Sequence, residues 1–76
     1  MNHSNIERGI RTRRALLAVA RICHARGQLL PTYTMLGSAV GLSNAQISRH
    51  MARLFDDGSV RVSWVGRRFR IESIRS

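Results

Sequence analysis

The hydrophobic pattern of this chain changes period near Gly58, and that change constrains the fold more than any other feature. Before Gly58, apolar residues recur at the three- and four-residue spacing of amphipathic helices. After it, apolar and polar residues alternate over 60–65 and again over 68–73, which is the period of a half-buried strand. The chain is therefore expected to form helices first and a pair of strands last.

The two alternating segments are predicted to form a β-hairpin closed by Gly66-Arg67, a two-residue turn with glycine first. Pairing outward from this turn sets Trp64 opposite Phe69 and Arg61 opposite Glu72. One face then carries Val60, Val62, Trp64, Phe69 and Ile71, and the other carries Arg61, Ser63, Arg68, Arg70 and Glu72. A shift of one residue would mix the two faces, which favours this register. Because Trp64 lies on the apolar face, we expect it to pack in the core rather than to act as a stacking platform.

Three helices are predicted before the hairpin, each with start and stop signals. They are Arg13–Arg26 before Gly27, a two-turn helix from the N-cap Thr32 to Gly41, and residues 43–57 from the N-cap Ser43 to Gly58. The inward positions are Leu16, Val19, Ala20 and Cys23 in the first helix, Leu36, Ala39 and Val40 in the second, and Ile47, Met51, Leu54 and Phe55 in the third.

Residues 1–11 leave three alternatives open. Ser4-Asn5-Ile6-Glu7 fits a capping box, so a helix can begin there. Gly9 weakens such a helix, and Thr12 offers a second N-cap. The segment is therefore expected to form a short helix, to extend the next one, or to be mobile, ahead of a single domain over residues 12–76.

The short segment Val40-Gly41-Leu42-Ser43 makes the second and third helices a helix-turn-helix candidate. Its glycine can take the positive φ that such a tight connection needs. With 76 residues, the chain has room for one domain with a modest core. Three helices followed by a two-stranded wing predict a mainly α fold of the winged helix-turn-helix class.

The charge of the chain indicates a polyanionic partner. Thirteen arginines stand against four acidic residues, there is no lysine, and the net charge is +9. Nucleic acid is the first candidate, followed by an acidic protein or an anionic membrane surface. Arginine can hold a phosphate or a guanine edge with two parallel hydrogen bonds, although codon usage in a GC-rich genome accounts equally well for the missing lysine.

Neither a membrane-spanning segment nor a secretion signal is indicated. No apolar run approaches the roughly 20 residues that cross a bilayer, and the first residues lack a charged-then-apolar pattern. We therefore expect a cytoplasmic, nucleoid-associated protein without a membrane partner.

The outward face of the third helix is the candidate base-reading surface, since glutamine can pair with adenine and arginine with guanine in the major groove. The predicted base contacts are Ser43, Asn44, Ala45, Gln46, Ser48, Arg49 and Arg53. The predicted contacts to the DNA backbone or from the wing are Thr32, Tyr33, Thr34, Arg67, Arg68 and Arg70. The alternatives are a solvated polar face, helix capping by Thr32, and a charged edge that discourages aggregation.

Catalytic and metal chemistry find little support. His3, His24, His50 and Cys23 lack the spacing of metal ligands, and Cys23 is expected to be a buried apolar residue. Asp56-Asp57 has the character of a solvated helix end, where two acids oppose the helix dipole for no evident reason. We expect no catalytic residue, no metal and no cofactor, and hence not an enzyme.

Thr12–Ile71, about four fifths of the chain, resembles the N-terminal DNA-binding domain of LexA-type repressors. The similar motifs are the helix ending in Gly27, Pro31-Thr32-x-x-x-Leu36, Gly41-Leu42-Ser43, His50-Met51-x-x-Leu54-x-x-x-Gly58, and the strand pair ending Arg70-Ile71. The resemblance implies sequence-specific duplex binding through the third helix. Position by position, it places Ser43, Ala45, Gln46, Ser48 and Arg49 on the base side.

The chain also departs from that family. Only Ile74-Arg75-Ser76 follows the hairpin and no lysine is present, so the family's self-cleavage by a serine and lysine pair is not expected. Ser48 and Arg49 stand where the family commonly has acidic groups, so the same operator is not expected either. A homodimer and a contact with RNA polymerase or another regulator stay open. The competing hypotheses are a protein-interaction module that docks an acidic partner, and a non-specific architectural or RNA-binding protein.

Overall fold

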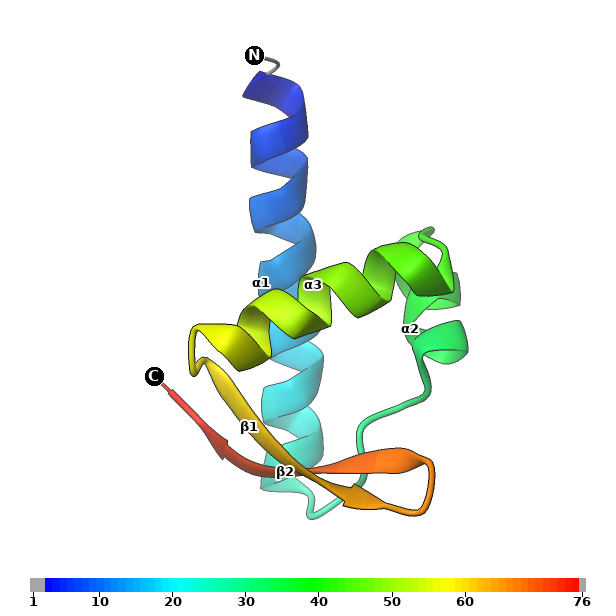
Figure 1. Cartoon of the computed structure of the whole chain (residues 1–76), viewed down its shortest axis with the longest axis vertical. Helices are drawn as coiled ribbons and strands as arrows, with labels where there is room; N and C mark the ends of the chain where they lie inside the picture. The colour runs from blue at the N-terminus through cyan, green and yellow to red at the C-terminus, as the bar shows by residue number, and fades with distance from the viewer. Residues whose placement is uncertain (1–2, 76) are drawn as a thin grey trace.

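The computed structural model describes residues 3–75, and the side chains of residues 7–75. Over this range three helices are followed by a two-stranded antiparallel hairpin, which confirms the predicted winged-helix arrangement (Figure 1). The elements are α1 (His3–Ala25), α2 (Tyr33–Val40), α3 (Asn44–Asp56), β1 (Val60–Val65) and β2 (Arg68–Ile74). In Figure 1, α3 crosses α1, and the hairpin lies below α3 and beside the end of α1.

α1 is one continuous helix that runs through Gly9, so of the three alternatives for the start of the chain the structure adopts the extension. The side-chain contacts of the predicted capping box at Ser4 lie outside the described residues. The helix ends as predicted at Gly27, which has a φ of 65°. There the backbone N–H of Gly27 donates to the carbonyl of His24 and that of Gln28 to the carbonyl of Cys23, at 3.2 and 2.8 Å. These two bonds form a Schellman motif, which satisfies the last carbonyls of the helix.

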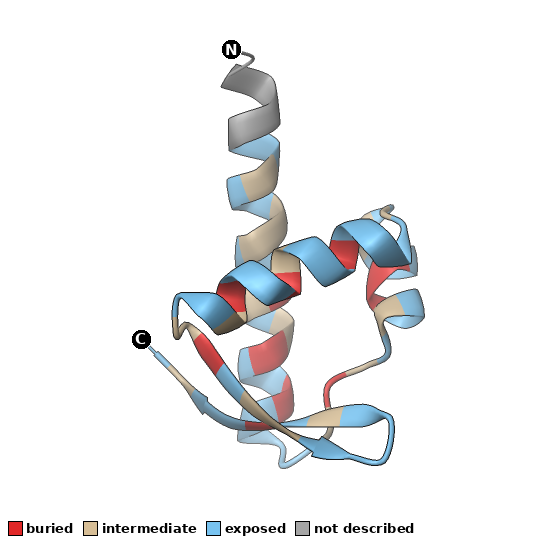
Figure 2. Ribbon diagram, viewed as in Figure 1, coloured by how far each residue is buried: buried red, intermediate tan, exposed pale blue. Residues whose placement is uncertain are grey.

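The core lies between the C-terminal half of α1, the inner face of α3 and the base of the hairpin (Figure 2). Its buried members are Leu16, Ala20, Cys23, Leu30, Leu36, Ile47, Met51, Leu54, Val60 and Ile71. Val19, predicted to point inward, is only partly buried and packs at the margin of this core. The N-terminal half of α1 extends past the core, and Ile10 is 41% exposed there.

α2 begins and ends where the sequence predicts, but its inward face differs. The Thr32 hydroxyl accepts the Met35 N–H at 3.2 Å as an N-cap, and Gly41 ends the helix with a φ of 74°. Ala39, expected inside, is exposed, and Gly37 is buried in its place. The reason is steric, since a Cβ at Gly37 would overlap the backbone carbonyl oxygen of Leu42. The chain folds back over Gly37 after the helix, and this determines which face of α2 is covered.

The hairpin has the predicted turn and register near its tip. Four pairs, from Val65 opposite Arg68 to Val62 opposite Ile71, are confirmed, and Gly66 has a φ of 63° in the turn. The predicted pairing of Arg61 with Glu72 is wrong, because a β-bulge shifts the register beyond Val62.

The bulge has a packing cause. It sets Arg61 opposite Ser73 and Val60 opposite Ile74, whereas an unbroken ladder would set Val60 opposite Ser73. Buried Val60 therefore meets an apolar partner on the core side. Glu72, the extra residue, stays exposed and accepts a hydrogen bond from the Ser63 hydroxyl.

The connection between α1 and α2 holds the wing against the helices. The Leu30 N–H donates to the carbonyl of Phe69 at 2.9 Å, and Leu29 forms a bridge with Arg70. The guanidinium of Arg68 donates through two nitrogens to the carbonyl of Leu30, at 3.3 and 3.1 Å. Both backbone polar groups of buried Leu30 thus have partners on β2, which fixes the position of the wing.

The expectation that Trp64 packs in the core is wrong, because its side chain is 68% exposed. Trp64 does lie on the apolar face of the hairpin, where its ring centroid is 4.1 Å from that of Phe69. That face, however, extends farther than the helices that cover it. Burial decreases along it from Val60 at the base, through partly buried Val62, to Trp64 near the tip.

Candidate nucleic-acid interface

The start of α3 is fixed by a complete capping box. The Ser43 hydroxyl accepts the backbone N–H of Gln46 at 3.2 Å, and the Gln46 side-chain oxygen accepts the backbone N–H of Ser43 at 2.9 Å. This reciprocal pair satisfies two backbone donors that a helix start otherwise leaves free. The first turn of α3 is therefore rigid, and the side chains that it presents have defined positions.

All seven predicted base contacts are exposed, on α3 or at its N-cap, and Ala45, Arg49 and Arg53 lie on the side away from the buried stripe of Ile47, Met51 and Leu54 (Figure 2). The exposed set is Ser43, Asn44, Ala45, Gln46, Ser48, Arg49 and Arg53. They spread over the outer side of the helix and both of its flanks. Whether they contact DNA stays a prediction.

Hydrogen bonds within the protein engage three of these side chains, those of Ser43, Gln46 and Asn44. The capping box uses the amide oxygen of Gln46, whereas two-point recognition of adenine needs both the oxygen and the amide N–H. The Asn44 amide nitrogen donates to the Thr34 hydroxyl at 3.0 Å, which ties α3 to α2. Arg49 and Arg53 are exposed, and the long reach of their guanidinium groups suits them to major-groove contact.

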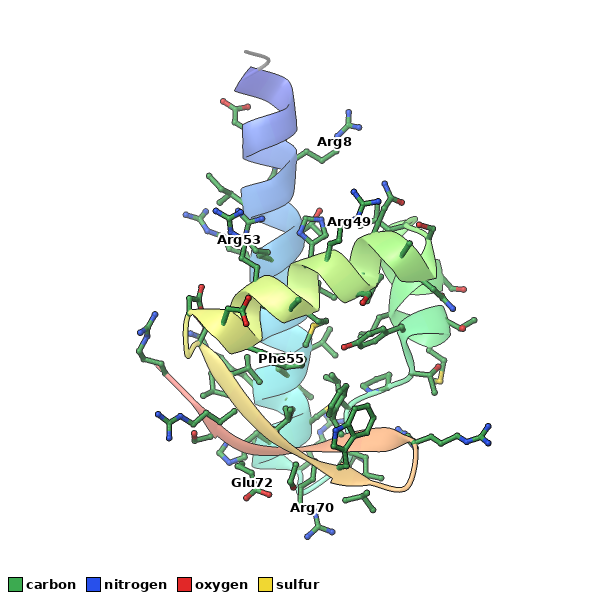
Figure 3. All side chains as sticks on the ribbon, in the orientation of Figure 1. Arg8, Arg49, Arg53, Phe55, Arg70 and Glu72 are labelled. Atoms are coloured by element: carbon green, nitrogen blue, oxygen red, sulfur yellow. The ribbon has the colours of Figure 1, made fainter. Side chains whose placement is uncertain are left out.

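A second basic element, α1, adjoins this face, and sequence reasoning missed it. A cleft between α1 and α3 is lined by Arg8, Gly9, Thr12, Leu42, Gln46, Arg49 and His50. Figure 3 shows the side chains of Arg8 and Arg49 rising from their two helices into the same corner. The extension of the α1 stripe through Gly9, Thr12 and Arg13 was the signal for this corner, but the glycine argued against a continuous helix there.

His50 lines the same cleft, is partly buried, and has two arginines beside it. Its Nδ1 is 3.5 Å from a guanidinium nitrogen of Arg13. Burial lowers the pKa of His50 below its ordinary value, and the positive charges of Arg13 and Arg49 lower it further. These surroundings disfavour the charged imidazolium and favour the arrival of negative charge.

The N-terminus of α2 contributes three residues predicted to contact the DNA backbone. The oxygens of Thr32 and Thr34 accept hydrogen bonds from Met35 and Asn44, which leaves each hydroxyl proton to donate outward. Tyr33 is partly buried, its ring centroid lies 6.2 Å from that of Phe69, and burial raises the pKa of its phenol. Tyr33 thus has a packing role as well.

The three wing arginines are exposed but do not share one direction. Arg67 occupies the turn at the hairpin tip. Arg68 is held by its two hydrogen bonds to Leu30. Arg70 extends away from α3, beside Glu72, on the lower side of the hairpin in Figure 3. Of the three, Arg67 is the one best placed to reach a backbone that also contacts α3.

Of the two acidic residues at the end of α3, Asp56 and Asp57, the second has a structural role. The Asp57 carboxylate accepts the backbone N–H of Ser59 at 2.8 Å, which closes the turn into β1. Hydrogen bonds from Ser59 lower the pKa of Asp57, and the charges of Arg75 and Arg13 contribute less. With Asp56 beside it, this end of α3 is acidic, and its two carboxylates lie close to Arg49 and Arg53, which line the same hollow.

The side chains that the structure describes, those of residues 7–75, include no group of three or more His, Cys, Asp or Glu that could hold a metal ion. In the same residues no helix is long and apolar enough to span a bilayer. Comparisons with protein-family models, with curated proteins and with solved structures give no match to this chain.

Proposed function

We propose that this chain is a sequence-specific double-stranded DNA-binding transcriptional regulator, which reads the major groove with α3 and contacts the backbone or minor groove with its wing. The observation that carries the proposal is the exposed face of α3. Residues 44–55 contain no acidic side chain, begin at a complete capping box, and present Arg49 and Arg53 to solvent. Asn44 and Gln46 are engaged within the domain, whereas Arg49 and Arg53 stay exposed.

The dimensions and charge of the protein support this function. α3 has 13 residues, about 20 Å of helix. The major groove, about 12 Å wide, admits such a helix, and arginine there pairs with O6 and N7 of guanine. The net charge of +9 supplies the sequence-independent attraction to phosphates.

Arginines from two further elements lie beside this face. Arg8 of α1 faces Arg49 across the corner, and Arg67 is at the wing tip. Both can hold phosphates while α3 contacts bases, which is the usual division between positioning and specifying contacts. The resemblance to LexA-type repressors supports the same use of the third helix, in a cytoplasmic protein of the nucleoid. An intrinsic enzymatic activity forms no part of the proposal.

The decisive experiment is selection from a random duplex library at about 50 and 200 mM salt, followed by sequencing of the retained duplexes. We expect one motif to remain enriched at the higher salt. A palindromic motif would indicate that the protein binds as a dimer. Binding that disappears at higher salt with no motif would refute sequence-specific recognition. Absence of duplex binding at the lower salt would refute DNA binding altogether and favour an acidic protein partner.

Three variants of equal charge assign the contacts. Arg49→Ala should weaken binding by about 1–3 kcal/mol and relax the preference at one base pair. Arg67→Ala should weaken all sequences alike and reduce the salt slope by about one. Arg70→Ala is the matched control, because Arg70 points away from α3, and it should change affinity least. Equal, sequence-independent losses in all three variants would contradict the assignment of α3 as the reader.

A further inference from the structure

A groove between the wing and the start of α2 contains Trp64 and Phe69, which have no part in the proposed reading of the major groove. Its volume is about 260 Å³, slightly below the roughly 300–1,000 Å³ of most small-molecule sites. Pro31, Thr32 and Tyr33 line one side, and Trp64, Arg67 and Phe69 line the other. This groove is therefore wide enough for one small planar group, and both of its walls are aromatic.

Tyr33, Trp64 and Phe69 line the groove and belong to one aromatic cluster, which Phe55 completes from behind Phe69. Phe69 is central, with ring centroids 4.1 Å from Trp64, 5.4 Å from Phe55 and 6.2 Å from Tyr33. Phe69 supports one side of the indole, while 68% of Trp64 stays open to solvent. An indole that is supported from one side and exposed on the other is a stacking surface.

The polar groups around the groove suit an anion. Arg67 and Arg68 line it, and none of the lining residues is acidic. The hydroxyls of Thr32 and Thr34 accept hydrogen bonds from within the protein, so their protons are free to donate into the groove. A planar aromatic surface next to cations and hydroxyl donors complements a nucleotide, which combines a π-face with a phosphate.

In a paired duplex, neighbouring bases cover one another's faces, so an indole has no access to them. We infer that the groove holds one unpaired nucleotide, with its base stacked on Trp64 and its phosphate bound by Arg67 and the Thr32 hydroxyl. Such a nucleotide occurs in a single strand, at a bulge or where a duplex is opened. The inference deepens the proposed function. It rests on that function when the unpaired nucleotide belongs to a duplex that the protein binds, and it is independent of it when the nucleotide belongs to a single strand.

Trp64 is the only tryptophan of the chain, so its fluorescence reports directly on the groove. Three probes are titrated: an oligothymidylate single strand, a fully paired duplex, and the same duplex with one extra unpaired thymidine. We expect the single strand and the bulged duplex to quench Trp64. We expect the bulged duplex to bind about 5- to 150-fold more tightly than the paired one, which is the factor that stacking of one base supplies.

Substitutions that keep the apolar bulk test the stacking itself, with binding followed through a dye on the DNA. Trp64→Phe should retain most of the preference for the bulged duplex, and Trp64→Leu should abolish it while binding of the paired duplex persists. Ile22→Ala is the control, since Ile22 is 52% exposed on α1 and does not line the groove. Circular dichroism of each variant verifies that the fold is retained.

The outcomes separate this inference from the proposed function. Equal affinity for both duplexes without quenching overturns the nucleotide groove, whether or not the library selection finds a motif. Equal weakening of both duplexes by Trp64→Leu also overturns it and makes Trp64 an ordinary backbone contact. If the single strand quenches Trp64 but the paired duplex does not bind, the proposed function fails and the groove stands.

Discussion

Replacing Gly37 with alanine tests the packing of the helix-turn-helix, because two well-known effects predict opposite signs. Gly37 lies inside α2, where alanine is favoured over glycine by roughly 1 kcal/mol in helix propensity. The added Cβ, however, would lie within 3.0 Å of the Leu42 carbonyl oxygen, a backbone atom that cannot rotate away. Propensity alone predicts stabilisation, and the structure predicts the reverse.

The magnitude follows from what must move. The Leu42 backbone has to shift until its carbonyl oxygen lies 3.4 Å or more from the added Cβ. That shift weakens a hydrogen bond, because the Leu42 N–H donates to the Gly37 carbonyl at 2.9 Å. Overpacking of this kind costs about 1–3 kcal/mol, and weakening the hydrogen bond adds about 1 kcal/mol. With the propensity gain subtracted, Gly37→Ala should destabilise the domain by about 1–3 kcal/mol.

Gly9→Ala is the matched control. Gly9 also lies inside a helix, but its added Cβ would meet only the flexible end of Arg13, at 3.3 Å. This variant should gain most of the roughly 1 kcal/mol of propensity. For a domain of this size, 1 kcal/mol shifts Tm by about 4–8 °C, so calorimetry should show Gly9→Ala above the wild type and Gly37→Ala below it. A Gly37→Ala variant with an unchanged or raised Tm would refute the close packing of the turn on α2.

Three further predictions concern stability. Ser43→Ala should remove the capping box and cost about 0.5–2 kcal/mol in urea unfolding, whereas Ser48→Ala, on the exposed face, should change little; equal effects would contradict the cap. Met51→Ala, at a fully buried site, should cost about 2–5 kcal/mol by the same assay, and a loss below 1 kcal/mol would contradict the described core. The lowered pKa of His50 means that the unfolded chain takes up this proton first, so stability should decrease as pH falls below about 6.5. His50→Gln should reduce that slope in urea titrations at several pH values, and an unchanged slope would assign the dependence to other groups.

Local signals in the sequence predicted much of the fold because they act within a few residues. The turn at Gly66, the caps at Thr32 and Ser43, and the stops at Gly27 and Gly41 each depend on one residue's backbone or hydroxyl chemistry. The structure places all of them as expected. The register near the hairpin tip follows from the same kind of local rule, since alternation and the turn leave no other pairing.

The errors arose where the answer depends on a distant part of the chain. Alternation shows that Trp64 lies on the apolar face, but not that the helices end before they reach it. The exposure of Ala39 follows from the path of Leu42 over Gly37, and the bulge at Glu72 from matching Val60 with Ile74. These are tertiary relations, and no short-range pattern encodes them.

The candidate site divides in the same way. Solvent exposure of the α3 residues was predictable from helical period alone, because Ile47, Met51 and Leu54 define the opposite face. The capping-box bond of Gln46 was signalled by the Ser-x-x-Gln spacing, but the prediction of this helix did not use that signal. The bond between Asn44 and Thr34 joins two helices, and no spacing within one helix predicts it. The corner between Arg8 and Arg49 required the crossing of α1 and α3, which only the structure supplies.

The attachment of Leu30 to β2 has a consequence for how the protein is made. During synthesis all three helices leave the ribosome before Phe69, whose carbonyl is the partner of the Leu30 N–H. Until then the core lacks Ile71, and the connection between α1 and α2 has an unpaired backbone donor. We therefore expect the nascent helices to stay loosely associated and to close cooperatively when the last strand docks, so that the slowest-exchanging amides of the finished protein include Leu30.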